Sequence, residues 1–191
     1  MVKYNSNVMK NAVKLCRIQP SHMILEVGFG PGIGLQEATK FLTDPKGKLF
    51  GLDFSEYMHK VAKMRLATHL RAGNVHLLHG RVECIPLPDR CIDGVYHSNC
   101  HLYWPNKTAA AAELLRVMKP GARMVTTLDM ALLRGGVQQG FFQGISVEPE
   151  SYLEALVTVG FADVHMEDQW DGGENFQVIW ATAPTTLGHR A

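Results

Sequence analysis

The chain has 191 residues, of which 46% are hydrophobic, and this length and composition predict one globular domain over residues 1–191. Its 19 basic and 18 acidic residues give a formal net charge of +1, so no electrostatic excess favours a nucleic-acid backbone or an anionic membrane as partner. No apolar run approaches the roughly 18 residues of a spanning helix, and no signal-peptide pattern opens the chain. We therefore expect a cytoplasmic protein without nucleic-acid or membrane partners.

The N-terminal segment is basic and has no acid before Glu26, which is also typical of organelle transit peptides; its basic residues are Lys3, Lys10, Lys14 and Arg17. Apolar residues nevertheless recur at helical spacing from Val8 to Cys16, directly before a buried strand. The sequence therefore favours a folded helix over a removable leader.

The four cysteines, Cys16, Cys84, Cys91 and Cys100, form no C-x-x-C pair, so we expect reduced thiols. His97, Cys100 and His101 lie close together, but the chain has no second ligand pair with the spacing of a structural zinc site. We therefore predict no metal site.

Strand-length apolar runs alternate with helical periodicity along the chain. After the N-terminal helix, the pattern predicts strands at 23–27, 48–52, 75–78, 91–96, 122–128, 162–166 and 176–183, and helices at 34–42, 56–70, 107–118 and 149–159. Pro120-Gly121 is expected to end the third of these helices, residues 134–144 are expected to form a loop, and Asp171-Gly172-Gly173 predicts a hairpin turn. This alternation predicts an α/β fold: a doubly wound, Rossmann-like seven-stranded sheet, mostly parallel, with a C-terminal antiparallel hairpin strand.

A glycine-rich turn, Glu26-Val27-Gly28-Phe29-Gly30-Pro31-Gly32, follows the first predicted strand. Ligands enter doubly wound sheets at the carboxyl ends of strands, and glycine lets the backbone approach them closely. The dinucleotide pattern G-x-G-x-x-G fails because Ile33 stands in place of its third glycine. Glu26 suits an ammonium ligand better than a pyrophosphate.

Asp53 ends the second predicted strand, 21 positions after Gly32. A carboxylate there can accept both hydroxyls of a ribose, and Phe54 and Met58 offer apolar area for an adenine. Asp53 could equally serve the start of the following helix, since Ser55 and Glu56 come next. The sequence leaves both roles open.

Two more segments follow in order, Gly80 to Asp89 and Leu114 to Arg123. With them the sequence resembles the class I S-adenosylmethionine-dependent methyltransferases, especially the group that includes ubiquinone and menaquinone biosynthesis methyltransferases. The resemblance runs from about Ile24 to Leu128 and returns at Val159-Gly160-Phe161, so it covers most of the chain.

The resemblance implies that S-adenosylmethionine is the cofactor and assigns residues to its parts. The methionine part would be surrounded by Glu26, Gly28, Phe29, Gly30, Gly32, His97 and Ser98, the ribose held by Asp53, and the adenine contacted by Phe54, Met58, Arg81, Val82 and Glu83. The family often has an acid at the position of Arg81 to accept from the adenine amino group. Arginine has no acceptor, so this contact moves to Glu83 or to backbone, or cofactor affinity is weaker.

The resemblance further implies methyl transfer to a small-molecule acceptor, because the Asn/Asp-Pro-Pro-Tyr signature of base-methylating enzymes is absent. His97 and His101 are the candidate general bases, since imidazole titrates near neutral pH, or they are hydrogen-bonding wall residues. An apolar acceptor lining is suggested by Tyr103, Trp104, Phe141 and Phe142, which could instead pack in the core.

Two alternatives remain open from the sequence. One is a catalytically silent member of the fold that binds the cofactor or a partner. The other is a short-chain dehydrogenase, because Gly28-x-x-x-Gly32-Ile33-Gly34 and Tyr103-x-x-x-Lys107 copy its patterns, although Pro105 would interrupt a helix between Tyr103 and Lys107. The acceptor atom and the oligomeric state cannot be read from the sequence.

Overall fold

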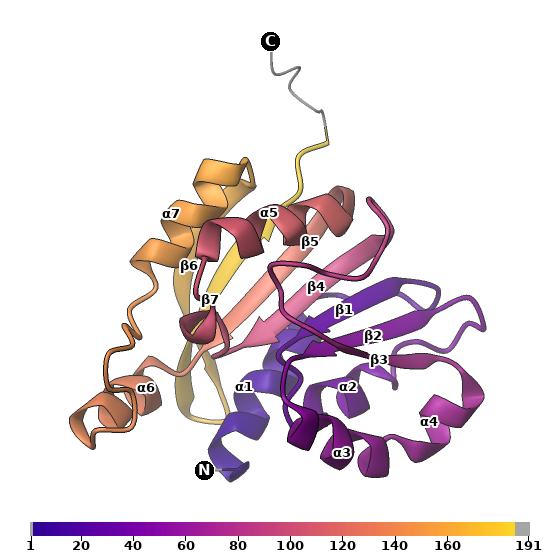
Figure 1. The fold of residues 1–191 in the computed structure, drawn as a ribbon, viewed down its shortest axis with the longest axis horizontal. Coiled ribbons are helices and arrows are strands. Elements are labelled where there is room, and N and C mark those ends of the chain that lie inside the picture. The colour runs from indigo at the N-terminus through magenta and orange to yellow at the C-terminus, as the bar shows by residue number, and fades with distance from the viewer. Residues whose placement is uncertain (1, 186–191) are drawn as a thin grey trace.

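A computed structural model describes residues 2–185; residues 1 and 186–191 of the predicted domain lie outside the described residues. Its seven strands form one sheet in the order β3-β2-β1-β4-β5-β7-β6 (Figure 1). The strands are β1 (Met23–Val27), β2 (Lys48–Asp53), β3 (Val75–His79), β4 (Ile92–Ser98), β5 (Met118–Leu128), β6 (Ala162–Asp171) and β7 (Glu174–Thr182). Strands β1 to β5 are parallel, and β7 runs antiparallel to both β5 and β6. The predicted fold class is confirmed.

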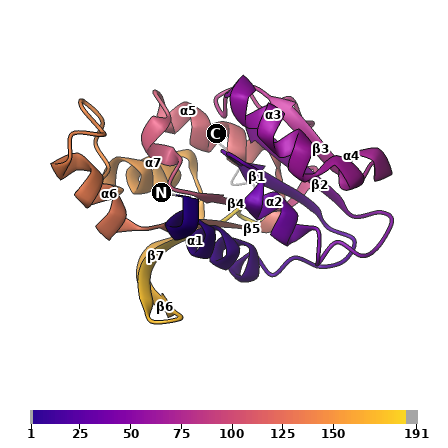
Figure 2. The ribbon, with the colours of Figure 1, turned by 90° about the horizontal axis from the view of Figure 1, so that it is seen from below.

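The helices are α1 (Val2–Leu15), α2 (Ile33–Ala38), α3 (Glu56–Arg65), α4 (Ala67–Ala72), α5 (Lys107–Val117), α6 (Met130–Gln138) and α7 (Glu150–Val159), with a short 3-10 turn, η1, at His101–Tyr103. Figure 2 shows α5 and α7 on one side of the sheet and α1 and α2 on the other. None of the helices within residues 2–185 is long and apolar enough to cross a membrane.

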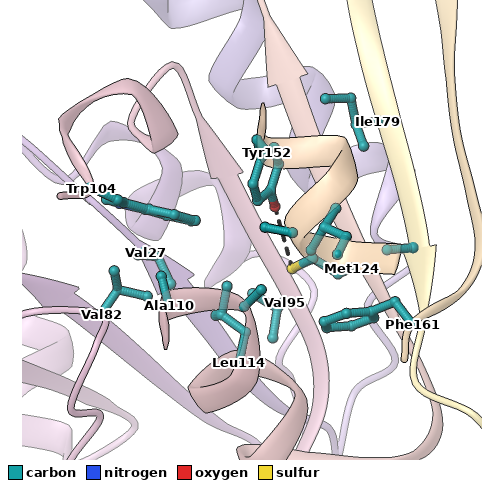
Figure 3. Packing of buried hydrophobic residues seen from close by; sticks show 14 of the residues in the cluster. Val27, Val82, Val95, Trp104, Ala110, Leu114, Met124, Tyr152, Phe161 and Ile179 are labelled. Carbon is teal, nitrogen blue, oxygen red and sulfur yellow. Dashed lines mark hydrogen bonds between the residues drawn. The ribbon is translucent and has the colours of Figure 1, made fainter. Parts of the chain in front are cut away.

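Two hydrophobic clusters cover the two faces of the sheet, because successive side chains of a strand point to opposite faces. Leu25 and Val95 pack with α5 and α7, whereas their neighbours Ile24 and Tyr96 pack with α1 and α2. In the first cluster the Tyr152 hydroxyl donates to the Met124 sulfur at 3.9 Å (Figure 3). Burial on both faces explains why the central strands read as almost continuous apolar runs.

The predicted helix 56–70 is wrong as one element, because the chain leaves helical geometry at Leu66 (φ −104°, ψ 15°) between α3 and α4. Leu66 is fully buried, as is Ala62 one turn before it. Their spacing continues the helical pattern of α3, so periodicity alone does not reveal the break. The predicted helix 34–42 is also shorter, since α2 ends at Ala38.

The helix α5 ends at Val117, before the predicted stop, and Pro120-Gly121 lies inside β5. Pairing between β4 and β5 begins at Ile92 with Met118 and then shifts register before Gly94 pairs with Arg123. This irregularity accommodates a proline that cannot donate to the sheet and a glycine with φ +77°.

The loop predicted at 134–144 is wrong over its first half, because α6 extends to Gln138. Asp129 caps this helix by accepting the Leu132 N–H at 2.8 Å. Gly136 lies where a Cβ would approach the Phe142 ring to within 2.5 Å, so this glycine serves close packing. The predicted hairpin turn is confirmed: Asp171 pairs with Glu174, and Gly172 and Gly173 have φ values of +59° and +84°.

Candidate functional site

The glycine-rich turn leaves β1 in a left-handed conformation, with φ values of +67° at Gly28, +51° at Gly30 and +79° at Gly32. The Gly28 N–H donates to the Leu52 carbonyl at 2.7 Å, which ties the turn to the end of β2. A Cβ at Gly28 would lie 2.7 Å from the Cys100 Cβ, whereas one at Gly30 would meet no protein atom within 4 Å. The turn therefore packs against Cys100 at Gly28 and borders empty space at Gly30.

Asp53 holds the turn from the end of β2. One of its carboxylate oxygens accepts the Gly30 N–H and the other accepts the Ser55 N–H, both at 2.9 Å. The cap of α3 is Ser55 itself, which accepts the Met58 N–H at 3.3 Å. Asp53 is 8% exposed and keeps acceptor capacity on both oxygens, so it orders the backbone and still offers a carboxylate.

Glu26 lies behind the turn and is 3% exposed. The Tyr96 hydroxyl donates to one of its oxygens at 2.9 Å, and a Cβ at position 34 would collide with the carboxyl, which explains Gly34. Burial raises the pKa of Glu26 to about 8, with the nearby Asp53 charge adding to the rise and the Tyr96 hydrogen bond opposing it. The carboxyl is therefore mostly neutral at pH 7.

A cavity of about 890 Å³ opens at the carboxyl ends of β1, β2 and β4. It brings together nine of the residues predicted to bind the cofactor, namely Gly28, Gly30, Asp53, Phe54, Met58, Arg81, Val82, Glu83 and Ser98. Its other side is formed by the segment after β4, by α6 and by the residues that follow α6. The predicted lining residues Tyr103, Trp104, Phe141 and Phe142 all contribute there.

Four predicted cofactor residues lie outside the cavity lining: Glu26, Phe29, Gly32 and His97, the last of which is described below with His101. Glu26 is buried behind the turn, as described above. The Phe29 ring is fully buried in the core and meets the His59 ring edge-on at a centroid distance of 4.9 Å. Gly32 precedes α2, where a Cβ would lie 3.2 Å from the Ala62 side chain. Gly32 and the Phe29 side chain therefore serve the packing of the turn against the core.

The two candidate bases, His97 and His101, are fully buried and also lie outside the cavity lining. His97 Nε2 lies 2.9 Å from the Tyr152 hydroxyl and 2.8 Å from that of Thr126. His101 stacks on Tyr152 at 5.1 Å, and within residues 2–185 neither of its ring nitrogens has a hydrogen-bond partner. Burial lowers the pKa of His97 well below its usual value and that of His101 to about 4, so both rings are neutral at pH 7.

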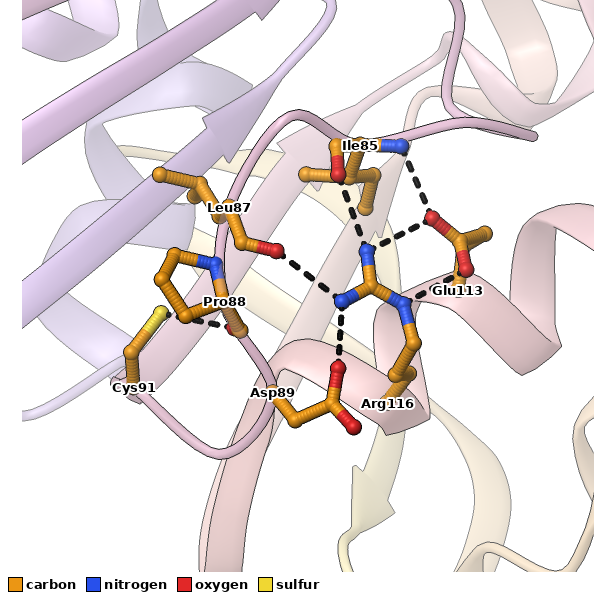
Figure 4. A network of polar contacts seen from close by, with 7 residues as sticks. All are labelled: Ile85, Leu87, Pro88, Asp89, Cys91, Glu113 and Arg116. Carbon is orange, nitrogen blue, oxygen red and sulfur yellow. Dashed lines mark hydrogen bonds and ion pairs between the residues drawn. The ribbon is translucent and has the colours of Figure 1, made fainter.

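The segment from Gly80 to Asp89 is fixed to α5 by Arg116 (Figure 4). The guanidinium donates to the carbonyls of Ile85 and Leu87, each at 2.9 Å, and to the Asp89 carboxylate at 2.7 Å. It also forms a forked pair with Glu113 at 2.6 and 2.8 Å, and Glu113 in turn accepts the Ile85 N–H at 2.8 Å. Two motifs far apart in the sequence thus form one support for Val82 and Glu83.

Sequence reasoning missed several residues of the cavity lining, including Ser55, Gly80 and the first residues of α6. The α6 residues could have been found, because they follow the carboxyl end of β5 as the others follow β1, β2 and β4. The glycines at 135 and 136 had instead indicated a loop. Among residues 2–185, no three His, Cys, Asp or Glu side chains are grouped to hold a metal ion.

Comparison with known proteins decides the family. A family model described as a methyltransferase domain matches residues 24–121, from β1 to the early part of β5. This chain belongs to the S-adenosylmethionine-dependent methyltransferases. The cofactor predicted from the sequence is thereby confirmed as S-adenosylmethionine.

This methyltransferase is 32% identical over 129 residues to the uncharacterized methyltransferase YdaC of Bacillus subtilis, a match that covers 68% of each chain. It is also 32% identical over 127 residues to the demethylmenaquinone methyltransferase of Geobacillus kaustophilus, covering 65% of this chain but only 50% of that one. The chain thus spans about half the length of that quinone-methylating relative.

Among solved structures, a chain of the complex between the Haloferax volcanii Trm112 methyltransferase activator and a methyltransferase aligns with a TM-score of 0.79 at 17% identity, covering 95% of this chain and 91% of that one. At this identity the likeness shows the fold alone. The dehydrogenase alternative is excluded by the family, and Tyr103 and Lys107 do not share a helix, because η1 ends at Tyr103 and α5 begins at Lys107.

Proposed function

We propose that this methyltransferase transfers the methyl group of S-adenosylmethionine to a small, uncharged acceptor with an apolar, ring-containing face. The observation that carries the proposal is the composition of the cavity beyond the glycine turn. No Asp, Glu, Lys, Arg or His side chain lies among the lining residues of that side, which are Tyr103, Trp104, Pro105, Ala131, Leu132, Leu133, Gly135, Gly136, Gln139, Phe141 and Phe142. A charged acceptor would lose its hydration there without gaining an ionic partner.

The opposite side of the cavity suits the cofactor. We propose that the free acceptor capacity of Asp53 serves the ribose hydroxyls, that Phe54 and Met58 flank the adenine, and that the turn at Gly28 and Gly30 receives the methionine part together with Ser98. The open space at Gly30 supports this fit, since a side chain there would enter the cavity. Glu26, behind the turn, would complement the cofactor's ammonium group.

Bound S-adenosylmethionine supplies a methyl group that its sulfonium already makes electrophilic. The protein's own residues would orient the acceptor and exclude water, and orientation of this kind contributes roughly 7 to 11 kcal/mol in favourable cases. We assign no base role to His97 or His101, because both are fully buried outside the cavity and burial lowers their pKa values, which makes them weaker bases. We therefore propose that a proton carried by the acceptor atom passes to water after methyl transfer, and not to a protein base.

The cofactor part is tested by calorimetric titration with S-adenosylmethionine. We expect the Asp53→Ala variant to bind at least about tenfold more weakly than the wild type, a loss of about 1.4 kcal/mol. Glu56→Ala is the control, since this exposed side chain follows on α3 but does not line the cavity. Equal affinities for wild type and Asp53→Ala would remove Asp53 from the ribose role.

The acceptor part is tested with methyl-labelled S-adenosylmethionine and three pools of small molecules: neutral aromatic, cationic and phosphorylated. We expect label in products of the neutral aromatic pool. Label confined to the charged pools would contradict the proposed acceptor class. Cofactor binding without label from any pool or from a whole metabolite extract would favour the catalytically silent alternative.

We also propose a cytoplasmic location. The support for it is that all four cysteines are free thiols, which suits a reducing compartment.

A further inference from the structure

The outer side of α3 carries apolar residues where a helix on a protein surface usually carries polar ones. His59 and Ala62 are the buried residues of this helix. Tyr57 and Met64 lie on the opposite side and are 68% and 76% exposed. Because they are seven positions apart, they lie on one stripe of the helix, two turns from each other. The stripe that faces away from the core therefore presents two large apolar side chains to the surroundings.

The same surface is basic. Helices α3 and α4 lie next to each other (Figure 1), and the chain between Tyr57 and Ala72 contains no Asp or Glu. Its exposed basic residues are Lys60, Lys63, Arg65 and Arg71. Within residues 2–185, neither Lys60 nor Lys63 has an ion pair. Lys60 also lies on the outer stripe, between Tyr57 and Met64.

This local charge is hidden in the balance of the whole chain. The formal net charge of +1 averages the basic surface of α3 and α4 with the rest of the sequence. The expectation of no membrane partner was drawn from that average. It therefore does not take account of a single face on which cations and exposed apolar side chains occur together.

The combination of cations with apolar side chains indicates the kind of partner. An anionic lipid surface attracts Lys and Arg and also takes up apolar side chains at the boundary between headgroups and acyl chains. Lysine can lay its methylene stem along that boundary while its ammonium group stays among the headgroups. The backbone of a nucleic-acid duplex would use the cations alone. A second copy of this chain, placed face to face, would set the cations against each other.

We propose that the α3–α4 face, defined by the exposed residues Tyr57, Lys60, Lys63, Met64 and Arg71, binds the surface of anionic lipid membranes. Arg65 is not included, because its guanidinium donates to the Pro31 carbonyl and to the Gln36 side chain. The proposal does not rest on the proposed acceptor or on the placement of the cofactor. It has a consequence for the cavity, since Phe54 lies just before α3, lines the cavity and is 60% exposed. A membrane bound at α3 would lie beside the cavity mouth.

Co-sedimentation with lipid vesicles tests the proposal. We expect the wild type to bind vesicles of phosphatidylcholine mixed with phosphatidylglycerol more tightly than vesicles of phosphatidylcholine alone, and to bind more weakly as the salt concentration rises. Each basic residue near an anionic surface contributes about fivefold in affinity, so the double variant Lys60→Gln/Lys63→Gln should bind at least about tenfold more weakly. Lys10→Gln/Lys46→Gln is the matched control, because it removes the same charge from exposed positions outside α3 and α4.

A further double variant isolates the apolar contribution. Tyr57→Ser/Met64→Ser keeps every charge and should bind the mixed vesicles at least about threefold more weakly, because less apolar area is buried in the boundary region. Circular dichroism verifies that these variants of exposed residues fold.

Three results would overturn the proposal. The first is failure of the wild type to bind the mixed vesicles, and the second is an equal loss of binding in the lysine variant and its control. The third is unchanged vesicle binding by Tyr57→Ser/Met64→Ser together with tighter binding of the wild type to duplex DNA, which would favour a nucleic-acid backbone as the partner. None of these measurements involves the cofactor, so the proposed function is tested separately.

Discussion

Glu26 is a buried carboxyl group behind the turn that we propose receives the methionine part of the cofactor. Burial raises the pKa of Glu26 to about 8, and the Asp53 charge, which has the same sign, adds to the rise. A cationic group near Glu26 would favour the ionised form and lower this pKa. The proposed role of Glu26 toward an ammonium group therefore has a consequence for the proton count of binding.

We predict that binding of S-adenosylmethionine at pH 7 releases close to one proton, because a carboxyl with a pKa of about 8 is mostly protonated before binding. Titration calorimetry in buffers of different ionisation enthalpy measures this number. Glu26→Gln should release no proton and show an affinity that varies less between pH 6 and 8. A wild-type binding enthalpy that is independent of the buffer would refute the ammonium role.

At the scale of elements, the site depends on how firmly the segment between β3 and β4 is attached to α5. Arg116 makes this attachment with a planar group that reaches two carbonyls and two carboxylates at once. Its hydrogen bonds hold the pKa of Glu113 below its usual value. An ammonium group cannot reproduce this planar, forked geometry.

We predict that Arg116→Lys lowers the free energy of unfolding by about 2 kcal/mol, because several charge-assisted hydrogen bonds are lost at a side chain that is only 31% exposed. Affinity for S-adenosylmethionine should fall as well, since Val82 and Glu83 lose their support. Urea unfolding and calorimetry measure the two effects. Arg134→Lys is the control, because the pair with Glu148 is exposed on both sides and the free energy of unfolding should stay close to that of the wild type. Equal losses of stability and of cofactor affinity in the two variants would show that Arg116 does not support the site more than an exposed arginine does.

The strands β1, β2 and β4 could be predicted closely because burial on both faces leaves an apolar run that few other elements produce. The mostly exposed β6 was predicted over only half of its length. The residues at which helices begin and end were harder to predict where the conformation or packing of a single residue determines them. Leu66 keeps the helical spacing while its backbone leaves the helix, and Gly136 indicates a loop although it serves the packing of Phe142. The Oε1 atom of Glu83 is buried without a hydrogen-bond partner within residues 2–185. This burial depends on contacts between segments far apart in the chain, so no local sequence pattern predicts it.

For the whole molecule, two buried imidazoles make stability sensitive to acid. His97 and His101 have pKa values below those of an unfolded chain, which are near 6.5. Below pH 6.5 the unfolded chain therefore binds protons that the folded protein does not, and stability is lost as the pH falls toward the folded pKa of His101, about 4. Glu26 acts in the opposite direction, because its folded pKa of about 8 lies above the unfolded value and its contribution is lost as the pH rises from 4.5 through 8.

We predict that His101→Phe, which keeps the ring stacked on Tyr152, reduces the loss of stability between pH 6.5 and 4. The difference from the wild type should reach roughly 1.4 kcal/mol per pH unit at most, the value for one proton. Urea unfolding at a series of pH values measures it. His165→Gln, at an exposed position of β6, should follow the wild type; a parallel wild-type and His101→Phe profile would show that His101 is not responsible.

The side of the cavity assigned to the acceptor comes largely from one continuous stretch, α6 and the residues up to Phe142. Its beginning is anchored where the Asp129 N–H donates to Asn99 and the Met130 N–H donates to Gln177, and Arg134 joins Glu148 just before α7. The cofactor side shares none of this stretch. If this side receives the acceptor as we propose, an exchange of this segment between related enzymes would change acceptor preference as a unit and leave the residues proposed to hold the methyl donor in place.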